Sequence, residues 1–193
     1  MTNYGADFMT EAELSRLPFA ARGRNVQIHP RTTLVNVENL SIGDNVRIDP
    51  DVVILATGQV RIGSYVHIGA QAYFAGGAGI ELGDFCGVSQ GAKLYSTNDD
   101  YSGRFLTGPT VPSEFVNVAR AKVVVGRHVV IGAGAIVLPG VTLGEGSAVG
   151  ALSLVRRDVE AWTIYAGAPA RKVAERSKDL LLHEKVLKAQ RQP

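Results

Sequence analysis

Aliphatic residues recur at every sixth position over much of the chain. Between Val125 and Val155 each block of six opens with an aliphatic residue, and glycine follows it in four of five blocks. A period of six is neither the 3.6 of an α-helix nor an open-ended alternation of two. It predicts short strands separated by tight turns, as in a parallel β-helix. We expect the aliphatic residues to point into a prism and the glycines to supply backbone freedom at its corners.

The same pattern occupies the first half of the chain with a longer period. Ile42-Gly43, Ile62-Gly63 and Leu82-Gly83 recur at intervals of twenty, which is three sixes plus two. The pattern predicts three strands per turn with a two-residue bulge at one corner. The later turns run at eighteen. We therefore predict an all-β fold, a β-helix over residues 26–173.

The repeat stops between Leu94 and Val123, where Pro109 and Pro112 interrupt the chain. A loop of this length inside a compact repeat is more often functional than not. We assign it to residues 95–122 and expect it to leave the prism as an extended arm and return.

Short helices are predicted at both ends. Thr10-Glu11-Ala12-Glu13 matches a helix-capping box, which predicts a helix over 10–17 that covers the open end of the prism. It belongs to an N-terminal segment, residues 1–25. Leucines and valines spaced among charges predict an amphipathic helix within the C-terminal segment, residues 174–193.

Composition limits the class of protein. A chain of 193 residues that is 46% hydrophobic and only 7% aromatic predicts one domain with a core of small and β-branched residues. A net charge of +2, with its basic residues spread out, gives no case for a nucleic-acid partner. The single cysteine, Cys86, fits a reducing compartment, and the sequence has neither a signal-peptide pattern nor a membrane-spanning run. We expect a cytoplasmic protein without a transmembrane segment.

The coils, the excursion loop and the closing Ala166-Gly167-Ala168-Pro169-Ala170-Arg171 together resemble the hexapeptide-repeat acyltransferases. The resemblance covers about residues 26–173 and is greatest to the galactoside and xenobiotic acetyltransferases and to sugar acetyltransferases of polysaccharide clusters. It implies a left-handed β-helix, a homotrimer, and acetyl-CoA sites in the clefts between neighbouring prisms. The loop of one subunit would reach across the cleft to its neighbour.

The resemblance also implies a set of cofactor-binding residues. Small residues after the Gly of two late coils let the pantetheine approach the backbone, and arginines suit phosphates because their planar fork bonds in two places. The implied residues are Ala133, Ala151, Arg156, Arg157, Arg171 and Lys172.

Galactoside-type members carry a histidine base at the start of the loop, and here that position is Asp99. An ordinary aspartate, with a pKa of about 4, is a poor base at neutral pH, although a cleft or a like-charged neighbour such as Asp100 would improve it. An amine acceptor relaxes the need for a base. We therefore predict catalysis by Asp99 and Asp100 on the amino group of a nucleotide-linked amino sugar in surface-polysaccharide biosynthesis. Acetylation of a sugar hydroxyl stays open as the alternative.

Four further residues are candidates for binding the acceptor. The family's acceptor-orienting asparagine is replaced by Gly69, with Gln71 two residues on, and the others are Asn98, Glu114 and His67. Several candidates have a plainer interpretation: Asp99 and Asp100 as turn formers, Glu114 as a solvated loop charge, and His67 as an inert outward side chain. His128 is expected at the surface.

Two other classes of protein compete with an acetyltransferase. A metal-dependent lyase on a β-helix needs three histidines with a close pair, whereas His29, His67, His128 and His183 stand far apart. We therefore predict no metal. A non-catalytic scaffold needs neither the arm, nor the paired arginines, nor the closing motif.

Overall fold

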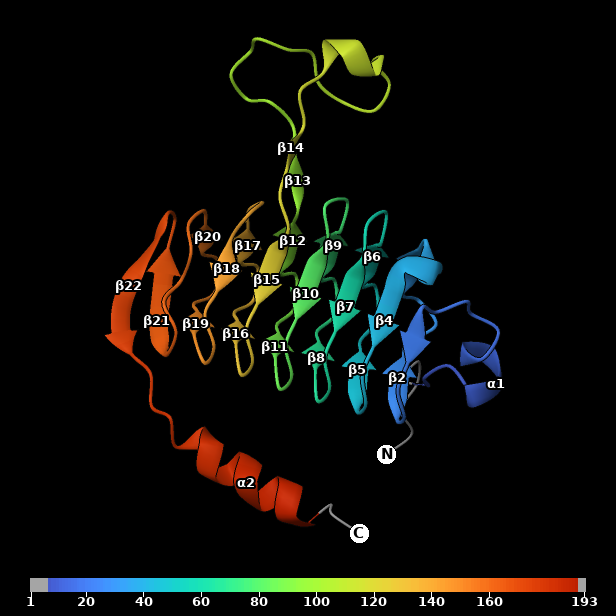
Figure 1. Cartoon of the computed structure of the whole chain (residues 1–193), viewed down its shortest axis with the longest axis vertical. Coiled ribbons are helices and arrows are strands. Elements are labelled where there is room, and N and C mark those ends of the chain that lie inside the picture. The colour runs from blue at the N-terminus through green and yellow to red at the C-terminus, as the bar shows by residue number, and fades with distance from the viewer. Residues whose placement is uncertain (1–6, 191–193) are drawn as a thin grey trace.

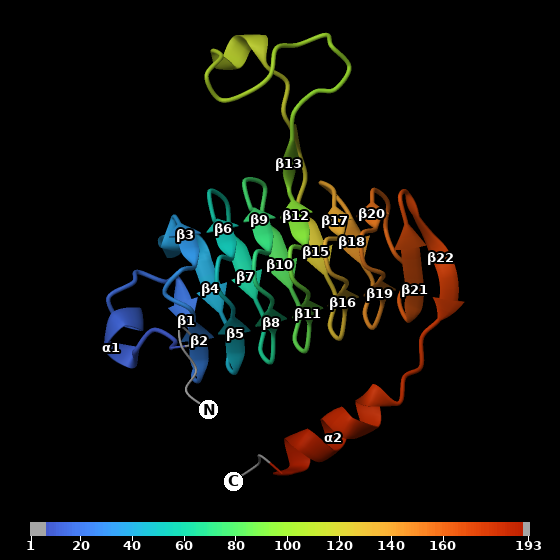
Figure 2. The same cartoon turned by 180° about the vertical axis from the view of Figure 1, so that it is seen from behind.

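A computed structural model describes residues 7–190; the predictions for residues 1–6 and 191–193 lie outside this range. The chain winds into a left-handed parallel β-helix of triangular cross-section (Figures 1 and 2). Each turn adds one strand to each of three parallel sheets, here named A, B and C in the order in which the chain visits them. The predicted fold class is confirmed.

The strands of each sheet follow one another at intervals of one turn. Sheet A contains β1 (Ala21–Arg22), β4 (Leu40–Ile42), β7 (Val60–Ile62), β10 (Ile80–Leu82), β15 (Val123–Val125) and β18 (Thr142–Leu143). Sheet B contains β2 (Val26–Ile28), β5 (Val46–Ile48), β8 (His67–Ile68), β11 (Gly87–Val88), β16 (Val130–Ile131), β19 (Ala148–Val149), β21 (Thr163–Gly167) and β22 (Ala170–Glu175). Sheet C contains β3 (Thr33–Val35), β6 (Val53–Leu55), β9 (Tyr73–Ala75), β12 (Lys93–Tyr95), β17 (Ile136–Val137) and β20 (Leu154–Val155).

The core consists of columns of aliphatic side chains, one for each strand position that points inward. In sheet A, Ile62 pairs in register with Leu82, and Leu82 with Val125. These side chains are buried, as are those at the matching positions of sheets B and C. A period of six therefore places an aliphatic residue on the prism axis at every face, and the burial of this apolar surface holds the coils together.

The glycines that follow the aliphatic residues serve close packing between coils. A Cβ on Gly43 would lie 2.6 Å from Ser64 Oγ and 2.8 Å from the carbonyl carbon of Gly63 in the next coil. The left-handed backbone occurs two residues later, for example at Asn45 (φ 58°) and Tyr65 (φ 59°). The prediction that these glycines supply backbone freedom was therefore wrong: they are needed because the coils approach too closely for a side chain.

The predicted two-residue bulge lies at the corner between sheets C and A. Eight residues separate the inward positions Ile54 and Ile62 across this corner, but six separate Val137 and Leu143 in the later coils. The excursion also leaves from this corner, after β12, and returns before β15. The bulge and the excursion thus lie on the same edge of the prism.

The N-terminal helix, α1 (Glu11–Leu14), has the predicted capping box but is shorter than predicted. The chain turns after Ser15 and enters β1, so the prism begins near Ala21 rather than at Val26. Leu14 is buried against the core, and α1 lies over the first coil (Figure 1). Covering the end protects the unpaired edge of the first coil.

The C-terminal helix, α2 (Leu180–Gln190), starts later than residue 174, where the predicted C-terminal segment begins. Residues 174 and 175 instead belong to β22 (Ala170–Glu175), which pairs antiparallel with β21. This pairing satisfies backbone groups at the edge of the last coil, and that gain outweighs the helical preference of the segment.

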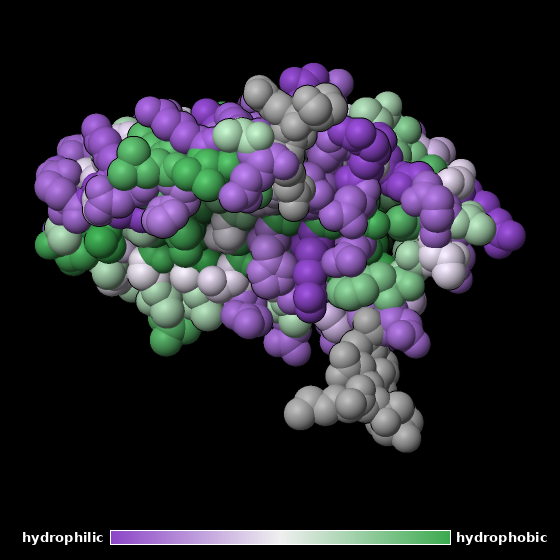
Figure 3. All heavy atoms as spheres, turned by 90° about the horizontal axis from the view of Figure 1, so that it is seen from below, coloured by the Kyte–Doolittle hydropathy of each residue, from purple (hydrophilic) through white to green (hydrophobic). Residues whose placement is uncertain are grey.

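Helix α2 is held against the corner between sheets A and B, on the side of the prism opposite the arm (Figures 1 and 2). Glu184 accepts hydrogen bonds from Arg127 (2.5 Å) and pairs with His128 (2.9 Å). Lys188 and then Arg127 lower the pKa of Glu184 to about 2, against the cost of burial. Leu182 and Val186 remain exposed, and Figure 3 shows this face with hydrophobic patches among polar side chains.

His128 is buried, so the expectation of a surface residue was wrong. It occupies a left-handed corner position directly above Phe85, and the two rings stack with centroids 5.1 Å apart. Phe85 stacks in turn on Tyr65 at 4.7 Å. Successive corners therefore bring aromatic rings into one column, and α2 covers it.

Candidate active site

The arm stands on a two-stranded stalk. Strands β13 (Thr97–Asn98) and β14 (Ala119–Arg120) pair antiparallel, and the 3-10 helix η2 (Ser113–Phe115) lies near the tip. Ser96, at the foot of the stalk, is fully buried; its hydroxyl donates to the Ala75 carbonyl (2.8 Å) and accepts from the Ala78 amide (2.9 Å). These bonds fix the direction in which the arm leaves the prism (Figure 1).

A cavity of about 520 Å³ lies where the arm meets sheet C. Its walls are of two kinds. The polar side is formed by Thr57, Thr97, Asn98 and Asp99, and the apolar side by Leu55, Tyr73, Ala75, Tyr95, Pro109 and Val118. The bulge residues Thr57 and Gly77 contribute to the lining, so the longer period of the early coils helps to build this cavity.

Of the acceptor and catalytic residues predicted from the sequence, Asn98 and Asp99 line this cavity. The Asp100 carboxylate instead closes a turn of the arm, accepting from the Ser102 amide (2.7 Å) and hydroxyl (2.8 Å). These hydrogen bonds lower the pKa of Asp100, which makes it a weaker proton acceptor. Glu114 is exposed in η2, away from the lining.

His67 and Gln71 lie elsewhere on the prism. His67 faces outward from sheet B, where its Nε2 pairs with Asp49 Oδ2 at 2.8 Å. Arg47 binds the other oxygen of Asp49 at 2.7 Å. Gln71 is exposed at the corner between sheets B and C. Within one chain, neither residue reaches the cavity at the base of the arm.

The predicted phosphate-binding arginines converge on a second cavity. Arg156, Arg157 and Arg171 line a space of about 240 Å³ beside the last coil. Tyr165 and Asp158 also line it, and the Asp158 carboxylate accepts a hydrogen bond from the Thr142 amide at 2.7 Å. Within residues 7–190, neither Arg156 nor Arg157 forms an ion pair with a carboxylate. Three guanidinium groups around one small cavity are suited to a phosphorylated ligand.

Lys172 is separated from these arginines. It binds Glu160 (2.9 Å) and Glu175 (2.7 Å), and Glu175, then Glu160, raise its pKa. Neighbouring residues of a strand point to opposite faces, so Arg171 and Lys172 diverge. Ala133 and Ala151 are exposed at the same corner of successive coils, between sheets B and C. They form a track of small residues at the far edge of sheet C.

Sheet C carries an apolar outer surface. Its outward positions hold Val35, Val53, Leu55, Tyr73, Ala75, Tyr95, Ile136, Leu138 and Leu154, and the polar residues Thr33 and Lys93 interrupt this surface. The corresponding positions of sheet A include Ser41, Arg61, Glu81 and Thr142. Contiguous apolar surface of this kind marks an interaction site in most soluble proteins. It lies between the two cavities described above.

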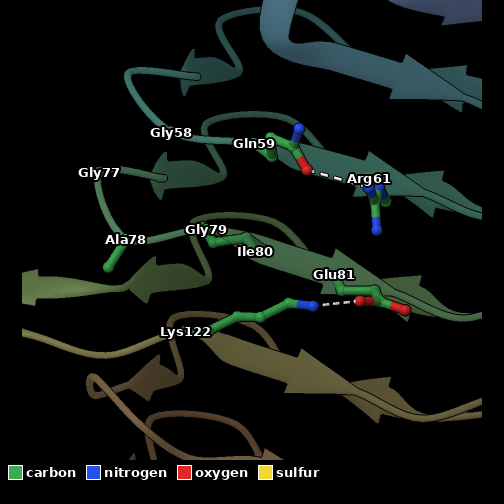
Figure 4. Close-up of a pocket in the computed structure, with 9 residues that line it drawn as sticks. All are labelled: Gly58, Gln59, Arg61, Gly77, Ala78, Gly79, Ile80, Glu81 and Lys122. Carbon is green, nitrogen blue, oxygen red and sulfur yellow. Dashed lines mark hydrogen bonds and ion pairs between the residues drawn. The ribbon is translucent and has the colours of Figure 1, made fainter.

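A third cavity, of about 370 Å³, opens on the sheet A side of the bulged corner (Figure 4). Its charged groups are already engaged: Lys122 forms an ion pair with Glu81, and Arg61 donates to Gln59 at 2.9 Å. Because these groups neutralise or satisfy one another, this cavity is a weaker candidate than the one containing Asp99.

Sequence reasoning missed the two tyrosines, Tyr73 and Tyr95, whose rings approach within 5.8 Å in the arm cavity. Burial raises the pKa of Tyr95. The sequence did contain a signal for these two residues: each is an aromatic residue at an outward strand position, in a chain otherwise poor in aromatic residues. Cys86 is buried, and burial raises the pKa of its thiol to about 12.

Over residues 7–190, no three His, Cys, Asp or Glu side chains gather closely enough to hold a metal ion. In the same range, neither helix has the length and hydrophobicity required to cross a membrane.

The prism, the arm and the arginine-lined cavity define a transferase of the hexapeptide-repeat class. Two family models match: the bacterial transferase hexapeptide over residues 122–157 and the hexapeptide repeat of succinyl-transferase over residues 59–95. The dTDP-4-amino-4,6-dideoxy-D-glucose acyltransferase of Escherichia coli is 41% identical over 94% of this chain and 95% of its own length. The chain belongs to the hexapeptide-repeat acyltransferase family.

Solved structures agree with this assignment. AntD, an N-acyltransferase from Bacillus cereus in complex with dTDP and 3-hydroxybutyryl-CoA, matches with a TM-score of 0.92 and 40% identity, over 96% of this chain and 99% of that one. A hexapeptide-repeat acetyltransferase from Vibrio cholerae, at 21% identity and a TM-score of 0.61, shares the fold.

Proposed function

We propose that this protein transfers an acetyl group from acetyl-CoA to the amino group of a nucleotide-linked 4-amino-4,6-dideoxy sugar. The observation that carries the proposal is an aspartate, Asp99, at the foot of the arm in a cavity with one polar and one apolar side. The Escherichia coli relative acts, by its name, on such a sugar. A structure of an AntD variant contains dTDP-4-amino-4,6-dideoxyglucose and coenzyme A.

The reaction needs little help to break the thioester. The lone pair of the neutral amine attacks the thioester carbonyl, a C–N bond forms, and the C–S bond then breaks. One proton leaves the nitrogen, and the departing thiolate gains one. Asp99 would hold the amino group and accept the proton as positive charge develops on nitrogen, a role worth about 10²–10⁴-fold in rate for a positioned base.

The donor would lie along the far edge of sheet C. The guanidinium groups of Arg156, Arg157 and Arg171 would bind its phosphates, and the exposed Ala133 and Ala151 would leave room for the pantetheine at the corner. The thioester would then point toward the earlier coils.

A pair of residues in AntD supports this placement. Its solved variants include changes at one serine and one aspartate that stand ten residues apart. The match covers nearly all of both chains, so equivalent residues have similar numbers, and Ser89 and Asp99 have the same separation here. Ser89 occupies the corner between sheets B and C, one coil before Ala133. Nothing in the hexapeptide pattern distinguished Ser89 from other corner residues.

Ser89 and Asp99 lie on opposite edges of sheet C, which suggests that one site is formed by two chains. Covering the apolar outer face of sheet C with a neighbouring prism would bring the arm of one copy to the Ser89 corner of the next. A closed ring of three prisms satisfies this head-to-tail contact. We therefore propose a homotrimer with its sites between subunits.

The test is release of coenzyme A thiol with a panel of nucleotide-linked sugars. We expect turnover of the 4-amino-4,6-dideoxy sugar, a loss of about 100-fold or more in kcat for Asp99→Asn, and a change of only a few-fold for the matched control Asp100→Asn. A longer acyl-CoA in the same panel tests the choice of donor.

Turnover of a neutral sugar in place of the amino sugar would assign the enzyme to O-acetylation. Absence of turnover with every acceptor, or full activity in Asp99→Asn, would overturn the proposal.

A further inference from the structure

The apolar side of the arm cavity is built from rigid parts. Tyr73 and Tyr95 project outward from β9 and β12, which pair in register within sheet C. Their rings lie at 41° to each other with centroids 5.8 Å apart. Leu55 adjoins them on the preceding coil. Because the side chains stand on consecutive coils, the prism itself fixes their spacing.

Asp99 is tied to the same framework. Only Ser96, which is buried and hydrogen-bonded to the Ala75 carbonyl, and the two residues of β13 separate Tyr95 from Asp99. Tyr95 and Asp99 therefore face one cavity from either side of an anchored corner. In a 4-amino-4,6-dideoxy sugar the methyl-bearing carbon is bonded to the amino-bearing carbon. When the amino group meets the Asp99 carboxylate, the methyl group therefore lies in the same cavity, where the tyrosine rings and Leu55 supply apolar contact.

We propose that Tyr73, Tyr95 and Leu55 form the surface that receives the deoxygenated edge of the acceptor sugar, and so determine specificity for deoxy amino sugars. This inference rests on the proposed function and extends it to substrate selection. The rings and the leucine offer large apolar contact area. A sugar with a hydroxyl at that edge would lose water there, and the side chains of Leu55 and Ala75 offer it no hydrogen-bonding group.

The expected selectivity has a limit set by chemistry. An apolar wall discriminates against a substrate with an added hydroxyl by at most about 100-fold in kcat/KM. Stronger discrimination requires a polar group of the protein that the wrong substrate leaves without a hydrogen-bond partner, and an apolar wall has no such group. We expect the wild-type enzyme to prefer the 6-deoxy amino sugar over its 6-hydroxy counterpart by about 10- to 100-fold in kcat/KM. The preference should appear mainly in KM, since the wall does not contact the reacting bond.

The experiment compares both substrates, each linked to the same nucleotide, across a set of variants. Tyr95→Ala should weaken binding of the deoxy substrate and so reduce the preference for it to within a few-fold. Tyr95→Phe keeps the ring and should leave the preference unchanged. Tyr101→Ala removes an arm tyrosine that is 88% exposed and lies outside the cavity lining, so it serves as the matched control. Asp99→Asn should lower kcat on both substrates alike.

Light scattering on each variant separates specificity from assembly, since Tyr95 also belongs to the outer face of sheet C. Ala75→Ser adds one hydroxyl to the same wall with little change in volume, and should narrow the preference by improving the hydroxylated substrate. An unchanged preference in both Tyr95→Ala and Ala75→Ser would overturn the inference while amino-sugar turnover continued. If the wild-type enzyme acetylated none of these sugars, that result would instead refute the proposed function.

Discussion

Three glycines allow the packing of the coils to be tested with one kind of substitution. In Gly63→Ala the new Cβ would lie 2.6 Å from Asp84 Oδ1 and 2.8 Å from the Asp84 amide nitrogen. Carbon needs about 3.5 Å or more, so the coils must separate by roughly 0.7 Å at this corner. That shift strains two bonds between the coils, Gly63 N to Leu82 O (2.8 Å) and Phe85 N to Ser64 O (2.9 Å).

The magnitude follows from these contacts. Two weakened hydrogen bonds at about 1 kcal/mol each, plus overpacking of about 1–2 kcal/mol, predict a loss of about 3 kcal/mol in the free energy of unfolding. Gly91→Ala meets no atom closer than 4.0 Å but has a φ of +67°, so it should lose only about 1–2 kcal/mol through backbone strain. Gly87→Ala meets nothing within 4 Å at an ordinary φ, and should be neutral or gain about 0.5 kcal/mol.

The measurement is urea unfolding followed by circular dichroism, at one protein concentration because stability of an oligomer depends on it. The urea midpoint should be highest for Gly87→Ala, intermediate for Gly91→Ala and lowest for Gly63→Ala. Equal midpoints for Gly63→Ala and Gly87→Ala would refute the argument that close approach of the coils requires these glycines.

Three further predictions concern α2, the donor site and assembly. The pKa of Glu184, about 2, lies below its free value of about 4.3, so its stabilising contribution is complete above pH 4.3 and is lost as the pH falls toward 2. Protection of the α2 amides, measured relative to intrinsic exchange at each pH, should fall over this range, and should fall at pH 6 in Glu184→Gln. Arg171→Ala should raise KM for acetyl-CoA about 10-fold, whereas Lys172→Ala should change it little. Ile136→Asp should dissociate the proposed trimer in light scattering, because it places a charge in the proposed contact, and Thr142→Asp on sheet A should not.

The sequence contained most of the fold because the repeat is local. Ile42, Ile62 and Leu82 mark equivalent positions of three coils, and their spacing alone predicts the strands, the bulge and the excursion. The family resemblance then located the arginines, and Arg156, Arg157 and Arg171 do converge on one cavity. An acyltransferase was predicted, and a relative at 41% identity confirms it.

The failures arise where contacts are long-range. His128 is buried because α2, more than fifty residues later, supplies Glu184. Residues 170–175 form a strand because the last coil offers an edge to pair with. Strand alternation separates Lys172 from Arg171, and Tyr73 and Tyr95 become neighbours only once the coils are stacked. Periodicity along the chain carries none of this information.

The arm has a consequence for how this enzyme can change. Its two ends are clamped by β13 and β14 and by the bond from the Ala121 amide to the Ser96 carbonyl, so the prism closes in the same way whatever lies between them. Lengthening a flexible loop costs little chain entropy, about 0.6 kcal/mol per doubling. Insertions between residues 100 and 108, beyond Asp99 and outside the cavity lining, should therefore cost little folding free energy. The stalk therefore separates the folding of the prism from the sequence of the arm, so the arm can change in length and composition while the prism keeps its structure.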